Sequence, residues 1–180
     1  MKTIVVYYSR TGSNEYLAEK IARSLNCDIE EIVPHLNLFF FVAVSSLLKK
    51  SPGIKTLSHN LSEYDRIVLC GPVFMGTFIS PLRGFISKYE KNIKKLYFAC
   101  CCASSDATKD DKFGHGSVFK MAKDILKEKL VFCEAFPIPL VVPEDKQKDS
   151  DLIMKTRLSD SNFTGEIQRR FENFIQKLAE

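Results

Sequence analysis

The stretch TIVVYYSRTGSN, residues 3–14, decides the fold of this chain. Its first half, Thr3–Tyr8, is an unbroken run of β-branched and aromatic residues, which is typical of a strand buried on both faces. Its second half, Ser9–Asn14, is polar, and a helical period of apolar residues follows from Tyr16 to Leu25. A buried strand, a short polar loop and an amphipathic helix are the expected start of an α/β domain with a parallel sheet.

The alternation of strand and helix continues along the chain. Further strands are predicted at Asp28–Val33, Asp65–Gly71, Leu96–Ala103 and Leu130–Val142. Further helices are predicted at 81–89, 116–130 and 163–178, whereas 104–114 and 143–162 have the composition of loops and turns. Because no repeat or Gly/Ser-rich linker interrupts this pattern, we expect one doubly wound α/β domain over residues 1–180, with helices on both faces of a five-stranded parallel sheet.

Length and charge exclude several classes of protein. A chain of 180 residues with 45% hydrophobic and 27% charged residues is long enough for one packed core and has neither a disordered nor a fibrous composition. The net charge of +4 is small and is spread over both halves of the chain. We therefore expect no nucleic-acid partner.

The beginning of the chain and its cysteines predict a cytoplasmic protein. Met1 leads directly into the first strand without the apolar region of a secretory signal, and the longest apolar-rich stretch, Leu36–Leu48, is shorter than a membrane-spanning helix. No cysteine pair has CxxC spacing, so we expect buried, reduced thiols. In a strand, Cys100, Cys101 and Cys102 alternate between two faces, which argues against a shared metal ion.

The loop Ser9–Asn14 has the composition of an anion site. Its hydroxyl groups can donate to phosphate oxygens, and Gly12 lets the backbone close around an anion. The N–H groups at the start of the following helix lack partners within the helix and carry positive dipole, so they favour the same ligand. The loop contains neither of the two common glycine-rich nucleotide motifs, GxxxxGK[ST] and GxGxxG. An ordinary polar capping loop is the alternative.

This loop resembles the phosphate-binding loop of flavodoxins and related FMN proteins, where a hydroxyl-x-Thr-Gly-x-Thr/Asn run holds the FMN phosphate. The resemblance implies the strand order 2-1-3-4-5 and noncovalent FMN as cofactor. It also implies that neutral donors hold most of the phosphate, with the Arg10 side chain either an additional cation or directed to solvent. The implied phosphate-binding residues are Ser9, Arg10, Thr11, Gly12, Ser13 and Asn14.

The same resemblance assigns two further loops. The segment after the third strand is similar to the loop beside the isoalloxazine ring; its residues are Pro72, Val73, Phe74, Met75, Gly76 and Thr77. Phe74 or Met75 would pack on a flavin face, unless both belong to the core. The peptide beside Gly76 would flip to bond the reduced flavin. The segment after the fourth strand would read the pyrimidine edge with backbone groups; it comprises Cys102, Ala103, Ser104, Ser105 and Asp106.

Expectations also follow for Phe113, His115 and an apolar segment outside these loops. Phe113 is a candidate for the second flavin face, and His115 is expected to be a solvated residue near a helix cap rather than a base. Residues 36–50, LNLFFFVAVSSLLKK, occupy the place of the second helix. Three consecutive phenylalanines cannot all face one side of a helix, so this segment either is a core helix with a lid or contacts another subunit or a membrane surface.

The expected function is electron transfer by an FMN-binding flavoprotein, with a redox protein or a small-molecule acceptor as partner. One alternative is an NAD(P)H-dependent FMN reductase of quinones or other small molecules. Another, from a different class, is a flavodoxin-like interaction module without FMN. The sequence contains no constellation of catalytic acid, base or nucleophile, and this does not separate the first two because a flavin carries the chemistry itself.

Overall fold

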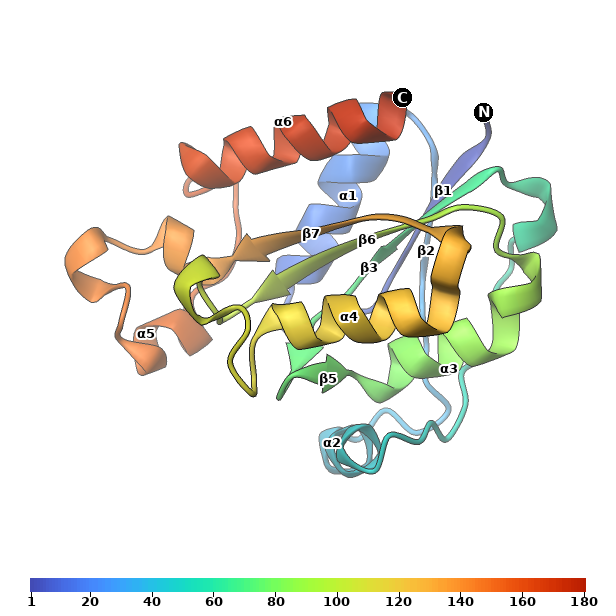
Figure 1. Cartoon of the computed structure of the whole chain (residues 1–180), viewed down its shortest axis with the longest axis horizontal. Helices are drawn as coiled ribbons and strands as arrows, with labels where there is room; N and C mark the ends of the chain where they lie inside the picture. Colours follow the sequence, from blue (N-terminus) through green and yellow to red (C-terminus); the bar gives the residue numbers. More distant parts are fainter.

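A five-stranded parallel sheet forms the centre of the molecule (Figure 1). The computed structural model describes all 180 residues. The strands lie in the order β2-β1-β3-β6-β7. Their bounds are Asp28–Glu31 (β2), Thr3–Tyr7 (β1), Arg66–Cys70 (β3), Leu96–Cys102 (β6) and Leu130–Pro137 (β7). Numbered among themselves, these strands have the predicted order 2-1-3-4-5, and the flavodoxin-like α/β fold class is confirmed.

Helices cover both faces of this sheet (Figure 1). One face is covered by α1 (Ser13–Leu25) and α6 (Glu166–Ala179), and the other by α3 (Ser80–Tyr89) and α4 (His115–Leu126). The core is accordingly divided into two apolar clusters, because successive strand residues point to opposite faces. Cys100 and Cys102 belong to one cluster and Cys101 to the other, as the alternation predicted.

The short helices and the second sheet add detail that the sequence pattern did not indicate. A two-stranded hairpin, β4 (Val73–Phe74) and β5 (Thr77–Phe78), occupies the predicted loop after β3. Its central residues, Met75 and Gly76, both have positive φ, as a tight two-residue hairpin turn requires. A helix, α5 (Ser150–Lys155), lies in the segment 143–162 that was expected to consist of turns.

The predicted end of the fifth strand is wrong for an identifiable reason. The fifth strand ends at Pro137 rather than Val142, because Pro137 and Pro139 lack the N–H needed to continue a ladder, and 138–141 forms a 3-10 turn. The second helix, α2, is shorter than the apolar segment 36–50 and spans Phe39–Leu47. None of the helices combines the length and the apolar composition needed to cross a bilayer.

The cysteines are all free thiols. Cys70 and the run Cys100–Cys102 are buried, as expected, whereas Cys27 and Cys133 are half-buried. Burial raises the pKa of the Cys27 thiol to about 11 and that of Cys133 to about 12, so both are protonated at neutral pH.

Candidate functional site

Three loops meet at the carboxyl ends of β1, β3 and β6. They surround a cavity of about 140 Å³. The loop after β1 contributes Thr11, Ser13 and Asn14, the loop after β3 contributes Pro72 and Val73, and the end of β6 contributes Cys101, Cys102 and Ala103. Strands β1 and β3 are neighbours although β2 lies between them in sequence, so this cavity sits where the strand order reverses. Ligands of doubly wound sheets bind at such a point.

The backbone of the loop after β1 presents free hydrogen-bond donors. The N–H groups of Thr11, Ser13, Asn14 and Glu15 have no acceptor within the protein, whereas Gly12 donates to the Ser9 hydroxyl at 3.1 Å. Gly12 has a φ of 96° and directly precedes the first residue of α1. These free N–H groups lie at the positive end of the helix dipole, so the loop can accept an anion.

Most side chains of this loop serve the protein itself. The Ser13 hydroxyl accepts from the Leu158 N–H at 3.2 Å, and the Asn14 side-chain oxygen accepts from the Cys101 N–H at 2.9 Å; both residues are buried. The Arg10 guanidinium lies over the Phe39 ring, 3.5 Å from its centroid. Thr11 is exposed and lines the cavity, so it is the loop hydroxyl best placed for a ligand.

The hairpin β4–β5 presents one apolar side chain and buries others. Met75, at its tip, is 50% exposed and therefore is not a core residue. Phe74 is half-buried and packs edge-on against Phe39, with 6.3 Å between the ring centroids. The Thr77 side chain is buried, accepts from Arg83 Nη2 at 3.1 Å and contacts the Met121 sulfur. Among the predicted residues of this loop, Met75 is the most open to a ligand.

Side chains after β6 hold their own loop in shape. The Ser104 hydroxyl contacts His115 Nδ1 at 2.9 Å, and Ser105 forms a capping box with Thr108. The Asp106 carboxylate is paired with Arg170, which lowers the pKa of Asp106. Ala103 is exposed. What this loop offers to a ligand is therefore its backbone.

The expectation for His115 is wrong. It is expected to be solvated, but its side chain is buried at the first turn of α4, because the loop 104–114 returns to its own start, where the His115 N–H and Nδ1 both contact the Ser104 hydroxyl. Its Nδ1 lies 3.6 Å from the Cys102 sulfur. Hydrogen bonding with Cys100 lowers the pKa of the Cys102 thiol against the effect of burial, and contacts with His115 and Ser104 add to this.

Arg170, on α6, was not identified from the sequence. Its guanidinium pairs with Asp106 in the loop, with Glu134 on β7 at 3.8 Å and with Glu166 on α6 at 3.2 Å. The pKa of Glu134 is raised by burial, an effect that Arg170 partly offsets. No local pattern in the sequence connects residues 106, 134 and 170, so only the folded chain reveals this cluster.

The segment that contains α5 was also missed as part of the site. Ile153, Met154, Thr156 and Arg157 line the same cavity as the loop after β1. The exposed Arg157 side chain folds over the end of α5, where it donates to the Met154 and Thr156 carbonyls. It brings a positive charge to a loop whose own arginine is stacked elsewhere.

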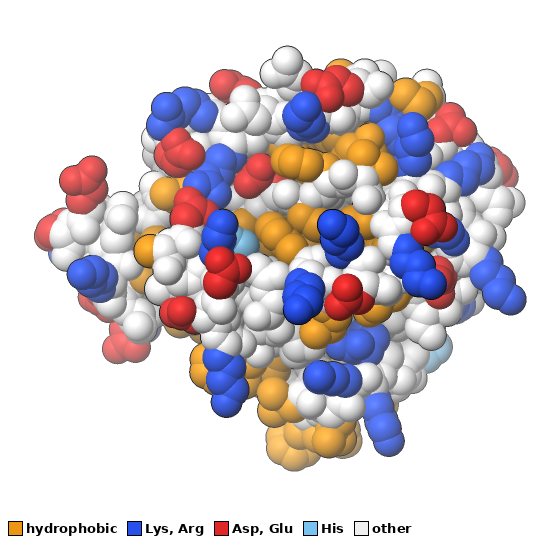
Figure 2. Space-filling view, viewed as in Figure 1, with side chains coloured by type: hydrophobic (Ala, Val, Ile, Leu, Met, Phe, Trp, Pro, Cys, Tyr) orange, Lys and Arg blue, Asp and Glu red, His pale blue; other side chains and the backbone are white.

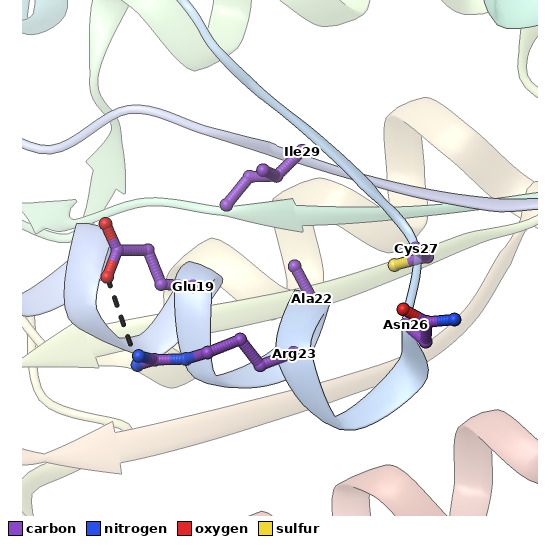
Figure 3. A pocket seen from close by; sticks show the side chains of 6 residues that line it. All are labelled: Glu19, Ala22, Arg23, Asn26, Cys27 and Ile29. Atoms are coloured by element: carbon purple, nitrogen blue, oxygen red, sulfur yellow. Dashed lines mark ion pairs between the residues drawn. The ribbon is translucent and has the colours of Figure 1, made fainter.

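A larger cavity, of about 320 Å³, lies between the last turns of α1 and β2, close to the opposite ends of the strands (Figure 3). Glu19, Ala22, Arg23, Asn26, Cys27 and Ile29 line it. The Glu19 and Arg23 side chains pair with each other along the helix at 3.9 Å. Because the cavity has no convergent set of free donors or acceptors, the site at the carboxyl ends of the strands is the better candidate.

Comparisons with known proteins show similarity to flavodoxin-like folds. A family model described as "Flavodoxin domain" matches residues 49–137. The crystal structure of a flavoprotein in complex with FMN from Lactobacillus acidophilus NCFM has a TM-score of 0.60 and 14% sequence identity, and the match covers 83% of this chain and 98% of that one. An NADPH-quinone reductase from P. pentosaceus has a TM-score of 0.57 and 14% identity, over 98% and 96% of the two chains. Curated protein sequences contain no significant match.

Proposed function

We propose that this chain, which has a flavodoxin-like fold and matches a flavodoxin domain model over residues 49–137, is an FMN-binding flavoprotein that transfers electrons. The observation that carries this proposal is the set of free N–H groups at Thr11 and 13–15, because Thr11, Ser13 and Asn14 line a cavity at the strand-order reversal. Donors fixed on a helix start favour a phosphate ester over a neutral ligand. The cofactor would supply electron exchange, and the protein its binding and orientation.

The proposal gives distinct roles to the residues of the site. The backbone of 11–15 and the Thr11 hydroxyl bind the phosphate, and Arg157, which lines the same cavity, supplies a cation. Ser13 and Asn14 contribute N–H groups, because their side chains are bonded to Leu158 and Cys101. Arg10 acts by holding Phe39 against the loop.

The ring system of FMN belongs at the open side of the site. The cavity of about 140 Å³ is smaller than the roughly 300–1,000 Å³ of pockets that enclose whole drug-sized ligands. We therefore assign it to the phosphate end of the cofactor. Met75 and Ala103, which are both exposed, would flank the ring, with the backbone of 103–106 along one edge. A ring held in this way keeps an edge accessible to an electron donor or acceptor.

The chemistry of the acceptor separates two versions of this function. In the first, the chain is a carrier between redox proteins. In the second, it is an NAD(P)H-dependent reductase of quinones, and one observation favours it: the exposed Met75 and Phe113 and the exposed α2 provide an apolar surface near the hairpin. We place either version in the cytoplasm, since the six cysteines are free thiols, and we treat residues 1–180 as one functional unit.

FMN binding can be tested by titrating the purified protein with FMN and with riboflavin while following flavin fluorescence. FMN should bind at least tenfold more tightly, because riboflavin lacks the phosphate. Thr11→Asp should weaken the binding of FMN by at least tenfold and leave the affinity for riboflavin unchanged, because the substitution adds a negative charge at the phosphate site. Thr56→Asp is the matched control, because Thr56 is exposed and lies beside Lys88 of α3. Failure of the wild type to bind FMN would favour the interaction module.

A turnover assay distinguishes the carrier from the reductase. FMN-loaded protein is mixed with NADH or NADPH and a soluble quinone, and nicotinamide oxidation is followed by absorbance. Multiple turnovers that need the quinone would identify the reductase. A protein that holds FMN, exchanges electrons with a chemical reductant and fails to oxidise either nicotinamide would be the carrier.

A further inference from the structure

The helix α2 has an apolar surface that no other part of the chain covers. Leu38 is 68% exposed and Phe40 is 70% exposed. Their exposed apolar neighbours are Leu36, Phe39, Phe41, Val44, Leu47 and Leu48. Figure 2 shows a group of hydrophobic side chains at the bottom of the molecule, where Figure 1 places α2, with basic side chains close by. We call residues 36–48 the α2 patch.

The attachment of α2 to the rest of the protein explains this exposure. Only Val42 and Ser46, one turn apart, are buried. Ser46 accepts from the Ser80 N–H at 2.7 Å, and it donates to the Val42 carbonyl within its own helix. The helix thus rests on α3 and β5 along a narrow stripe. Helices that are apolar all round are normally buried, so the remaining circumference of α2 calls for cover from outside the chain.

The charged residues that neighbour the α2 patch in the sequence all have one sign. No Asp or Glu occurs between Glu31 and Glu63. The same stretch contains Lys49, Lys50 and Lys55, and all three are exposed. Lys49 and Lys50 follow the last exposed leucine directly. Apolar side chains that protrude beside lysines are the composition of segments that lie in the headgroup region of anionic membranes.

A second copy of this chain fits the same surface less well. A twofold contact through the α2 patch would bring together the basic residues of both copies, with no carboxylate from residues 32–62 to compensate. An anionic lipid surface supplies the missing negative charge, and it also accepts apolar side chains of varied shape. The charge pattern therefore selects lipid over self-association.

We propose that the α2 patch docks this protein on the surface of membranes that contain anionic phospholipids. The side chains of Leu38, Phe40 and Leu48 enter the boundary between headgroups and acyl chains, and Lys49 and Lys50 contact lipid phosphates. Phe39 links the patch to the candidate site, because it stacks under Arg10 and against Phe74. This consequence rests on the FMN binding proposed above: docking brings the β4–β5 hairpin, beside which the flavin would lie, close to acceptors dissolved in the bilayer.

The test is co-sedimentation of the full chain with vesicles. Vesicles of phosphatidylglycerol and phosphatidylcholine should bind the wild type, and vesicles of phosphatidylcholine alone should bind it much less. Phe40→Ser should lower the partition coefficient at least tenfold. The double variant Lys49→Gln/Lys50→Gln should lower it by roughly 25-fold at low salt, with about fivefold from each charge. Val131→Ser is the matched control, because Val131 is also an exposed apolar residue but lies on β7, away from both the α2 patch and the candidate site.

Three results would overturn the proposal. The first is that the wild type stays in the supernatant with both kinds of vesicle. The second is that the Phe40→Ser variant binds vesicles as well as the wild type does. The third is that light scattering shows a dimer without lipid and that Phe40→Ser abolishes this dimer. The measurement is made with and without added FMN. Vesicle binding by a protein that takes up no FMN would refute the proposed function alone, and FMN uptake without vesicle binding would refute the docking alone.

Discussion

Two glycines beside the candidate site have the same kind of backbone conformation but very different surroundings. Gly12 has a φ of 96° and Gly76 a φ of 69°, a region in which side chains cost free energy. A Cβ at Gly12 would meet nothing within 4 Å. A Cβ at Gly76 would lie 2.2 Å from the Lys112 carbonyl oxygen, so the hairpin tip lies against the loop before α4. Gly76 is therefore required for packing as well as for backbone conformation.

This difference predicts unequal effects of alanine at the two positions. Gly12→Ala should lower the free energy of unfolding by about 1 kcal/mol, from backbone strain alone. Gly76→Ala should lower it by about 2–4 kcal/mol, because the Lys112 backbone must also move. Urea denaturation at neutral pH measures both. Equal losses would mean that the hairpin does not pack on the 112–113 backbone.

At the scale of elements, the Glu30 carboxylate ties the edge strand β2 to the segment before β3. Glu30 accepts from the Ser58 N–H at 2.5 Å and from the Ser58 hydroxyl at 2.9 Å, and its other oxygen lies 2.7 Å from His59 Nδ1. Burial raises the pKa of Glu30, but the hydrogen bonds from Ser58 and His59 outweigh it, and the net direction is downward. The ionised carboxylate is thus the form that the fold stabilises.

The sign of this shift predicts a loss of stability in acid. A carboxyl group with a lowered pKa in the folded state stabilises the protein above its unfolded pKa of about 4.3, and this contribution disappears as the pH falls through the folded pKa. Glu30→Gln should cost about 1–2 kcal/mol at pH 7 and much less at pH 3. Thermal unfolding at both pH values measures this. Glu63→Gln, at an exposed pair with Lys2, should cost less than 1 kcal/mol at either pH.

At the scale of the whole molecule, Arg170 connects the last helix to the candidate site. The Arg170 side chain is 17% exposed, and its guanidinium contacts carboxylates from the loop after β6, from β7 and from α6. Arg170 therefore fixes the loop after β6, which would border the flavin, through Asp106, a residue 64 positions earlier in the chain. Loss of this contact leaves the half-buried Glu134 carboxylate without its cation.

Replacement of Arg170 should affect both stability and the site. Arg170→Met should lower the free energy of unfolding by about 1–3 kcal/mol, less than for a fully buried pair because the cluster reaches solvent. It should also raise the pKa of Asp106, which NMR titration can measure. Arg169→Met is the control, since Arg169 is 72% exposed and pairs only with Glu166; its cost should stay within about 0.5 kcal/mol. Similar costs for both variants would show that the cluster does not stabilise the loop.

Local patterns in the sequence predicted the parallel sheet, and the resemblance to flavodoxins implied its strand order and the position of the candidate site. Unbroken apolar runs such as Thr3–Tyr8 predicted buried parallel strands, because a strand covered on both faces needs apolar residues at every position. Alternation along Cys100–Cys102 predicted their two faces for the same geometric reason. The resemblance of Ser9–Asn14 to a flavodoxin loop pointed to the carboxyl end of β1, and the structure brings this loop together with those after β3 and β6.

Only the tertiary structure decided which side chains remain free at that site. Ser13, Asn14 and Asp106 are polar loop residues, and nothing near them in sequence shows that they bond to Leu158, Cys101 and Arg170. The exposure of Phe40 likewise depends on how little of α2 the rest of the fold covers. Helical and strand periods arise from neighbouring residues and are visible in the sequence, whereas these contacts join distant segments and exist only once the chain is folded.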